Sequence, residues 1–160
     1  MRSHLARLLA PIILLSTSWS YEGVDPQKAV RAVLDSIAVD LVANNRASLV
    51  ARYDPHGAIL LGNWGLKAFP YDSLSTQVYG SRWSPPVRFA WHNVTIEPLG
   101  ARNAIVYAQF SWVSADGDSS LTSYTGVLLH DGKRWRVHSE HESPDPAFAR
   151  RHLCPADTSR

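Results

Sequence analysis

The chain has 160 residues, enough for one domain with a hydrophobic core and too few for two. Its 45% hydrophobic and 19% charged residues exclude a disordered or collagen-like chain. The formal net charge of +2 comes from Arg2 and Arg7, because basic and acidic residues balance in the remaining chain. The scattered Lys and Arg residues predict neither a nucleic-acid-binding surface nor electrostatic attachment to a membrane.

Residues 1–20 have the form of a signal peptide. A short basic segment precedes the apolar run Leu8–Leu15, and small polar residues follow up to Ser20, where a signal peptidase would cleave. The run is shorter than the roughly 20 apolar residues that span a bilayer. We therefore expect a secreted or periplasmic protein, with an uncleaved N-terminal anchor as the alternative. Residues 21–143 would form the domain and 144–160 a polar C-terminal tail.

The first element expected in the mature chain is a helix that Asp25 caps and Pro26 begins. Apolar residues then recur at spacings of three and four, which predicts one buried helix face: Val30, Val33, Leu34, Ile37 and Leu41. Asn44-Asn45 predicts the end of this helix. A shorter amphipathic segment, Ala47–Tyr53, runs into the turn "DPHG".

The middle of the chain predicts shorter elements. The residues "AILL" after the turn indicate a short strand, and Gly62–Lys67 a loop that carries Trp64. A third helical segment is expected from Asp72 over Leu74–Tyr79.

From Val87 onward the pattern is that of β-strands. The turn sequences "PLGAR", "ADGD" and "HDGK" separate runs rich in β-branched and aromatic residues, which predicts hairpins and an antiparallel meander. The runs are Val87–Glu97, Ala104–Ser114, Ser120–His130 and Trp135–Ser143. Helices first and a meander afterwards predict an α+β fold, with the helices packed on one face of a bent sheet.

The last strand, "GKRWRVHSEHES" after the hairpin "LLHDGK", resembles that of the nuclear transport factor two-like superfamily, particularly its SnoaL-like branch. In such strands a Trp is followed six residues later by His and eight later by Ser, and Trp135, His141 and Ser143 match this spacing. The long first helix and a second helix ending in Tyr53 before "DPHGAIL" extend the resemblance over about residues 27–143.

This resemblance implies a cone, in which a curved antiparallel sheet wraps around the long N-terminal helix and leaves a pocket (an α+β barrel, or cystatin-like roll). It also implies that two chains pair as a homodimer through the outer face of the sheet. The superfamily includes ketosteroid isomerases, dehydratases, polyketide cyclases and non-catalytic assembly domains. The fold therefore does not give the function.

Strict alternation of side chains along the last strand predicts two faces. The inner face, toward core and pocket, would hold Trp135, Val137, Ser139, His141 and Ser143, and the outer face Arg136, His138, Glu140 and Glu142. On this prediction the Cα atoms of His138 and Glu140 lie about 6.5–7 Å apart, with no further ligand at a recognisable spacing. We expect exposed ion pairs there, no metal site and no cofactor.

His141 is the candidate catalytic residue, because a histidine at a pocket can act as a general acid or base near neutral pH. The alternative is a structural histidine, hydrogen-bonded to a neighbouring group. The ketosteroid isomerases of the superfamily that this chain resembles place a carboxylate base on the strand after the second helix. This chain has "AILLGNW" there, without Asp or Glu, so isomerase chemistry of that kind is not expected.

Candidate ligand-binding residues come from the predicted pocket wall. Similar association domains line their pocket with polar residues of the second long strand, which Tyr107 and Gln109 would match. The other candidates are Tyr53, Trp64, Trp91, Tyr124 and Ser139. Aromatic walls with few polar groups suit a small, partly apolar molecule, whereas the alternative is that these rings fill the core or the dimer face. Asn93-Val94-Thr95 is a glycosylation sequon.

These expectations combine into an exported SnoaL-like domain that binds a small, partly apolar molecule in a cone pocket and forms a homodimer, with no assignable catalytic set. The alternative is a cofactor-independent isomerase, cyclase, dehydratase or hydrolase, with His141 as proton shuttle and Tyr107 or Tyr124 as hydrogen-bond donor. No nucleic-acid partner and no stable membrane insertion are expected.

Overall fold

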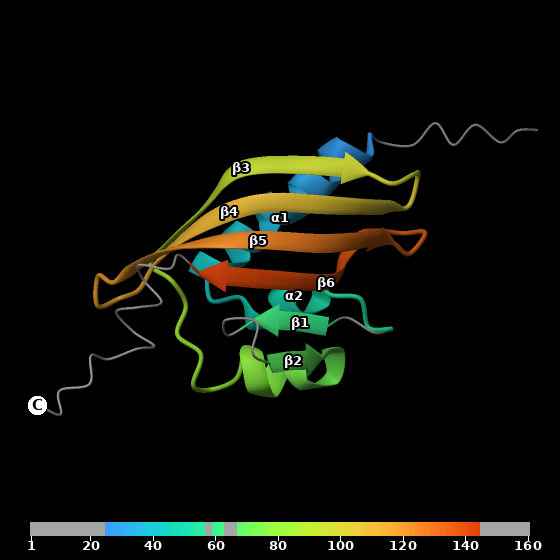
Figure 1. The fold of residues 1–160 in the computed structure, drawn as a ribbon. Coiled ribbons are helices and arrows are strands. Elements are labelled where there is room, and N and C mark those ends of the chain that lie inside the picture. Colours follow the sequence, from blue (N-terminus) through green and yellow to red (C-terminus); the bar gives the residue numbers. More distant parts are fainter. Residues whose placement is uncertain (1–24, 57–58, 63–66, 145–160) are drawn as a thin grey trace, which may run out of the picture.

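Among the residues that the structure describes, one six-stranded sheet and two α-helices make up most of the fold, with strand order β2-β1-β6-β5-β4-β3. The structure is a computed structural model that describes residues 25–56, 59–62 and 67–144. The long strands form the sheet in front of α1, while α2, β1 and β2 lie at its lower edge (Figure 1). The predicted signal peptide and residues 145–160 of the predicted C-terminal tail lie outside the described residues, as does Trp64.

Helix α1 (Pro26–Val42) begins where the sequence predicts. The Asp25 carboxylate accepts a hydrogen bond from the backbone N–H of Gln27 at 3.0 Å, and Pro26 occupies the first turn, where no donor is needed. The helix ends before Asn44, whose φ of 55° is the left-handed conformation that closes helices. Helix α2 (Arg46–Ala51) follows and carries the chain toward the edge of the sheet.

The predicted meander is confirmed. Strands β3 (Arg88–Pro98), β4 (Asn103–Val113), β5 (Ser119–His130) and β6 (Trp135–Pro144) pair with their sequence neighbours in antiparallel fashion. Their tight turns require glycines at positive φ, such as Gly117 at 86°.

The lower edge of the sheet was only partly predicted. Strand β1 (Ile59–Gly62) matches the "AILL" prediction, and it pairs with β6 in parallel, which local sequence does not indicate. Strand β2 (Lys67–Pro70) was not predicted, because its four residues show no alternation that marks a strand. A short 3₁₀ turn (Tyr71–Ser73) and one π-helical turn (Leu74–Val78) replace the predicted third helix.

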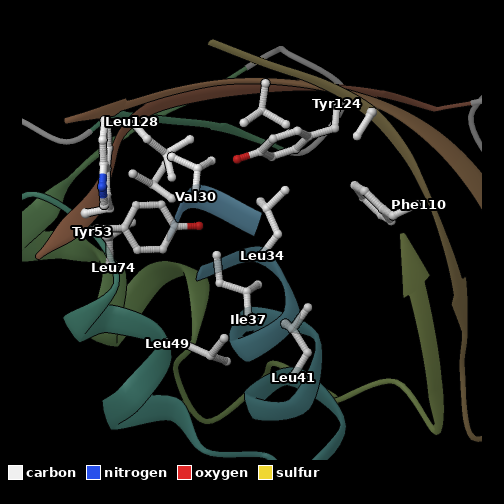
Figure 2. Packing of buried hydrophobic residues seen from close by; sticks show 14 of the residues in the cluster. Val30, Leu34, Ile37, Leu41, Leu49, Tyr53, Leu74, Phe110, Tyr124 and Leu128 are labelled. Atoms are coloured by element: carbon white, nitrogen blue, oxygen red, sulfur yellow. The ribbon is translucent and has the colours of Figure 1, made fainter. Parts of the chain in front are cut away.

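The hydrophobic core lies between α1 and the inner face of the sheet. Figure 2 shows Val30, Leu34 and Ile37 of α1 pointing into the same core as Phe110, Tyr124 and Leu128 of the sheet. Leu34 and Leu128 are fully buried, and such side chains each stabilise the fold by about 1.5–3 kcal/mol. Among the described residues, no helix combines the length and apolar character needed to cross a bilayer.

A β-bulge interrupts the alternation of β6. Val127 of β5 pairs with Ser139, but the next residue, Leu128, pairs with Val137. His138 is therefore an extra residue on β6, and such a residue reverses the face to which all later side chains of the strand point. Trp135 and Val137 point inward before the bulge, and Glu140 points inward after it. The predicted faces of the last strand are thus wrong from residue 139 onward.

Candidate functional site

A buried carboxyl group marks the inner face of β6. Glu140 is only 6% exposed, and both oxygens of its carboxyl group accept hydrogen bonds. The Tyr53 hydroxyl donates to Oε1 at 2.7 Å and the Tyr124 hydroxyl donates to Oε2 at 3.0 Å. Burying a carboxylate is costly unless its oxygens are paired, and these two hydroxyls supply that pairing.

Tyr53 reaches Glu140 because the chain after α2 joins the sheet. Tyr53 forms a parallel bridge with Val137, with backbone hydrogen bonds from Asp54 N–H to the Val137 carbonyl at 2.8 Å and from Val137 N–H to the Arg52 carbonyl at 2.9 Å. The bulge residue His138 adds a contact between its Nδ1 and the Asp54 carboxylate at 3.0 Å. The bulge and the end of α2 therefore hold each other in place beside Glu140.

A third tyrosine extends this network. The hydroxyl oxygens of Tyr79 and Tyr53 lie 3.2 Å apart, and since Tyr53 donates its proton to Glu140, Tyr79 donates to Tyr53. Arg46 of α2 fixes the segment that carries Tyr79, because its guanidinium donates to the carbonyls of Gly80 and Trp83 and lies 5.5 Å from the centre of the Trp83 ring. Arg46, Tyr79 and Gly80 line an open surface depression of about 600 Å³.

The ionisation of Glu140 is coupled to that of Glu142. Burial raises the pKa of Glu140 from 4.5 to about 7, although the hydroxyls of Tyr53 and Tyr124 lower it. Glu142 lies two residues further along β6 and is partly buried; its burial, and next the charge of Glu140, raise its pKa to about 8. Burial also raises the pKa values of the tyrosine hydroxyls, so they remain neutral donors. The two carboxyl groups therefore retain at least one proton near neutral pH.

The pair Glu140 and Glu142 differs from the other partly buried acids in having no basic partner among the described residues. Asp40 pairs with Arg52 at 2.9 Å. Asp54 pairs with His138. A buried acid is ordinarily paired or kept neutral, and here it is the retained proton that limits the charge.

Aromatic rings continue the inner face beyond the carboxyl groups. The ring centroids of Tyr124 and Trp91 lie 5.0 Å apart, and those of Trp91 and Phe110 lie 5.7 Å apart. The Trp112 and Trp83 rings pack edge to face, with their centroids 6.2 Å apart. Trp91, Trp83 and Trp112 remain partly exposed. The inner face thus offers aromatic surface next to two carboxyl groups.

Metal coordination has no candidate in the part of the chain that the structure describes. No three His, Cys, Asp or Glu side chains there gather in a group that could hold a metal ion. The hydrogen bonds of Glu140 come from hydroxyl groups, and its neighbour Glu142 adds one carboxyl.

The comparisons with known proteins give the fold. No family model matches the chain, and no curated protein does. Among solved structures, the S. rosetta CaMKII hub is 19% identical with a TM-score of 0.60, covering 77% of this chain and 99% of that chain. An NTF-2 like protein of unknown function from Shewanella oneidensis is 14% identical, with a TM-score of 0.57, over 74% and 99% of the two chains.

A third solved structure has a name that refers to an enzyme. The ketosteroid isomerase-like protein from Erwinia carotovora atroseptica is 17% identical with a TM-score of 0.61, covering 73% of this chain and 94% of that chain. The chain has the nuclear transport factor two-like fold. At these identities the likeness concerns the fold alone, so the function has to be argued from the site.

Within the nuclear transport factor two-like fold, the predicted site residues divide between the two faces of the sheet. Tyr53 and Tyr124 are buried at the inner face, and Trp91 lies beside them with its Nε1 donating to the Leu34 carbonyl at 2.8 Å. The predicted inward direction of the other described candidates is wrong. The residues on the outer face are Tyr107, Gln109, Ser139 and His141.

The physical reasons for these corrections differ. Val106, Ala108 and Phe110 are the buried residues of β4, so the alternating Tyr107 and Gln109 point outward, and Tyr107 is 45% exposed. Ser139 and His141 are turned outward by the bulge in β6. The role of His141 at an inner site thereby loses its geometric basis.

Glu140, Glu142 and Tyr79 are the residues of this site that the sequence analysis missed. One local feature does point to Glu140. Gly126 interrupts the strand sequence "LTSYTGVLLH", and an isolated glycine inside a strand often marks the close approach of another group. In the structure Gly126 pairs with Glu140.

Proposed function

We propose that the chain binds a small, partly apolar molecule against the inner face of the sheet, with the half-buried Glu142 contacting its polar part and Glu140 lying behind it. The observation that carries this proposal is the pair of inward carboxyl groups without a basic partner among the described residues. The partly exposed rings of Trp91 and Trp112 supply apolar surface beside them. Ligand sites of small molecules combine such surface with few polar groups.

The test is binding to the purified mature protein. Native mass spectrometry on gently purified protein would detect a co-purified molecule, and thermal shift with a panel of aromatic amines and aromatic ketones would detect added ones. Glu142→Gln should weaken binding at least tenfold, because one lost hydrogen bond to a charged or acidic group corresponds to about 1.5–3 kcal/mol. Glu97→Gln, an exposed glutamate of β3, is the matched control. If no molecule binds the wild type, the proposal is wrong.

The pH dependence of binding identifies the polar group of the ligand. A cationic amine should bind more tightly as the pH rises through the raised pKa values of Glu140 and Glu142, because ionised carboxylates attract it. A carbonyl acceptor needs a protonated carboxyl group as its donor, so its binding should weaken over the same range. Isothermal titration at several pH values distinguishes the two signs.

A second candidate function is cofactor-independent acid–base catalysis, such as isomerisation, cyclisation, dehydration or hydrolysis. Two adjacent carboxyl groups with pKa values raised toward neutrality favour it, because a general acid or base works best near the operating pH. Ketosteroid isomerase-like proteins share the fold. This candidate replaces His141, which is exposed on the outer face, by Glu142.

Deuterium exchange into small ketones, followed by proton NMR, tests that candidate. Glu142→Gln should abolish the exchange, whereas His141→Ala should leave its rate unchanged. A loss in His141→Ala with the fold intact would restore the role that the sequence analysis gave to His141. Exchange that neither variant affects would exclude both groups.

Homodimer formation is proposed through the outer face of the sheet. The centre of this face carries uncharged and histidine side chains: Tyr107, Gln109, Leu121, Ser123, Thr125 and His141. A stable dimer buries about 1,200–2,000 Å² in total, for which a four-stranded face has room. Tyr107→Arg should convert a dimer into monomers in light scattering, whereas Val39→Arg, at another exposed hydrophobic residue but on α1, should not. A wild type that is monomeric at high concentration would refute the proposal.

Export remains a proposal that rests on residues 1–20. Intact mass of the secreted product should show a chain that starts near Tyr21. A product that still begins at Met1 would exclude cleavage. The assignment to the SnoaL-like branch also rests on sequence, namely on the terminal strand around Trp135.

A further inference from the structure

Gly126 lies in the middle of β5, where glycine ordinarily weakens a strand. It is buried and faces Glu140 directly across the β5–β6 pair. The φ angle of Gly126 is not positive, so the backbone conformation does not require glycine there. The reason for glycine must therefore be the space that a side chain would occupy.

That space is filled by Tyr124, two residues earlier on the same face of β5. A Cβ atom at position 126 would lie 2.8 Å from both Cε1 and Cζ of the Tyr124 ring, and closer still to its hydroxyl oxygen. Contacts this short do not occur in folded proteins, and the neighbour is a ring that is itself buried. The ring thus lies along the strand, over Gly126. From there its hydroxyl reaches Glu140, the residue opposite Gly126, at 3.0 Å.

We propose that Gly126 is a positioning residue of the inner carboxyl pair: the missing side chain lets Tyr124 lie along β5 and donate its hydrogen bond to Glu140. Position 126 thereby sets the ionisation state that the inner face presents to a ligand. This inference concerns the free protein, so it stands or falls apart from the proposed binding function.

The surroundings of Glu140 define what the substitution changes. The titratable groups that act on it are the hydroxyls of Tyr53 and Tyr124, Tyr79 behind Tyr53, and the carboxyl of Glu142. On the buried face of α1, only Asp40 is titratable, and it is paired with Arg52; the other buried residues of α1 are apolar. Removing the Tyr124 donor would destabilise the ionised form of Glu140 and raise its pKa by about one, the equivalent of a hydrogen bond to a charged group.

Gly126→Ala is the test, with the Glu140 carboxyl followed by carbon-13 NMR on the free protein over a pH series. The pKa of Glu140 should rise by about one, as in Tyr124→Phe. The double variant should show no larger rise than either single variant, since both changes remove the same hydrogen bond. Thr125→Ala, on the outer face of the same strand, should leave the titration unchanged. A folded Gly126→Ala protein with the wild-type titration would overturn the proposal.

A Gly126→Ala chain that does not fold is also informative. The proposal then requires that Tyr124→Ala, which removes the ring, restores folding in the double variant. Recovery of the native circular dichroism spectrum and a cooperative melting transition would support the role of Tyr124. If Tyr124→Ala folds alone but fails to rescue Gly126→Ala, the collision involves another group and the proposal is wrong.

Discussion

Glu140→Gln should change how the stability of the protein depends on pH. The folded protein holds the Glu140 proton with a pKa of about 7, against 4.5 for an ordinary glutamate, because its carboxyl is buried. The folded state then binds more protons than the unfolded state between these two values. The free energy of unfolding therefore falls as the pH rises from about 4.5 to about 7, and this loss is complete above the folded pKa.

The size of this loss in the free energy of unfolding follows from the increase in the pKa of Glu140. A rise of about 2.5, from 4.5 to about 7, corresponds to about 3 kcal/mol at about 1.4 kcal/mol for each unit of pKa. Glutamine has nearly the same shape but no charge, and its amide oxygen and nitrogen can still meet the hydroxyls of Tyr53 and Tyr124. Between about pH 5 and pH 8, the free energy of unfolding of the variant should increase relative to that of the wild type by up to about 3 kcal/mol.

Urea unfolding at a series of pH values measures this difference directly. Any pH dependence of stability that the two proteins share cancels when the variant is compared with the wild type at each pH. Glu97→Gln is the control, because its side chain is exposed at the end of β3. A difference between Glu140→Gln and the wild type that stays constant with pH would refute the assignment of the raised pKa to burial of Glu140.

Other predictions concern the core and the ion pairs, and all are measured by urea unfolding. Leu34→Ala should cost about 2–5 kcal/mol, because Leu34 is fully buried and truncation leaves a cavity; a cost below about 1 kcal/mol would contradict the packing. Asp40→Asn should cost about 1–3 kcal/mol, because Asp40 is buried and accepts two hydrogen bonds from Arg52. Asp35→Asn breaks the exposed pair with Arg31 and should cost under about 0.5 kcal/mol, so equal costs for both would contradict the difference in burial.

Two features written in local sequence were predicted correctly. The Asp25-Pro26 start of α1 and its apolar spacing are local, and the glycine turns between the long strands fix their hairpins. The parallel pairing of β1 with β6 was missed because it joins residues about 80 positions apart, such as Leu60 and Glu140. No short-range pattern records such a pairing.

The candidate site was misjudged for a more specific reason. In β6 the apolar residues that reveal a buried face end at Val137, immediately before the extra residue at His138. The polar residues that follow do not indicate by their chemistry which of them are buried, so strict alternation was the only guide. The shift of face was therefore invisible from this strand alone, and Gly126 on the partner strand was the one accessible clue.

The bulge in β6 has a consequence for how such a site can change over evolution. If β6 paired with β5 without the bulge while keeping His138, Ser139, His141 and Ser143 would turn inward and the two carboxyl groups would move to the outer face, with no substitution at any of these positions. The ten residues of β6 thus encode two alternative interiors, one acidic and one built of histidine and hydroxyl groups. Deleting His138 would keep Glu140 and Glu142 inward, whereas a change that abolishes the bulge and keeps the residue, for example by removing the contact between His138 and Asp54, is the short evolutionary route from one to the other.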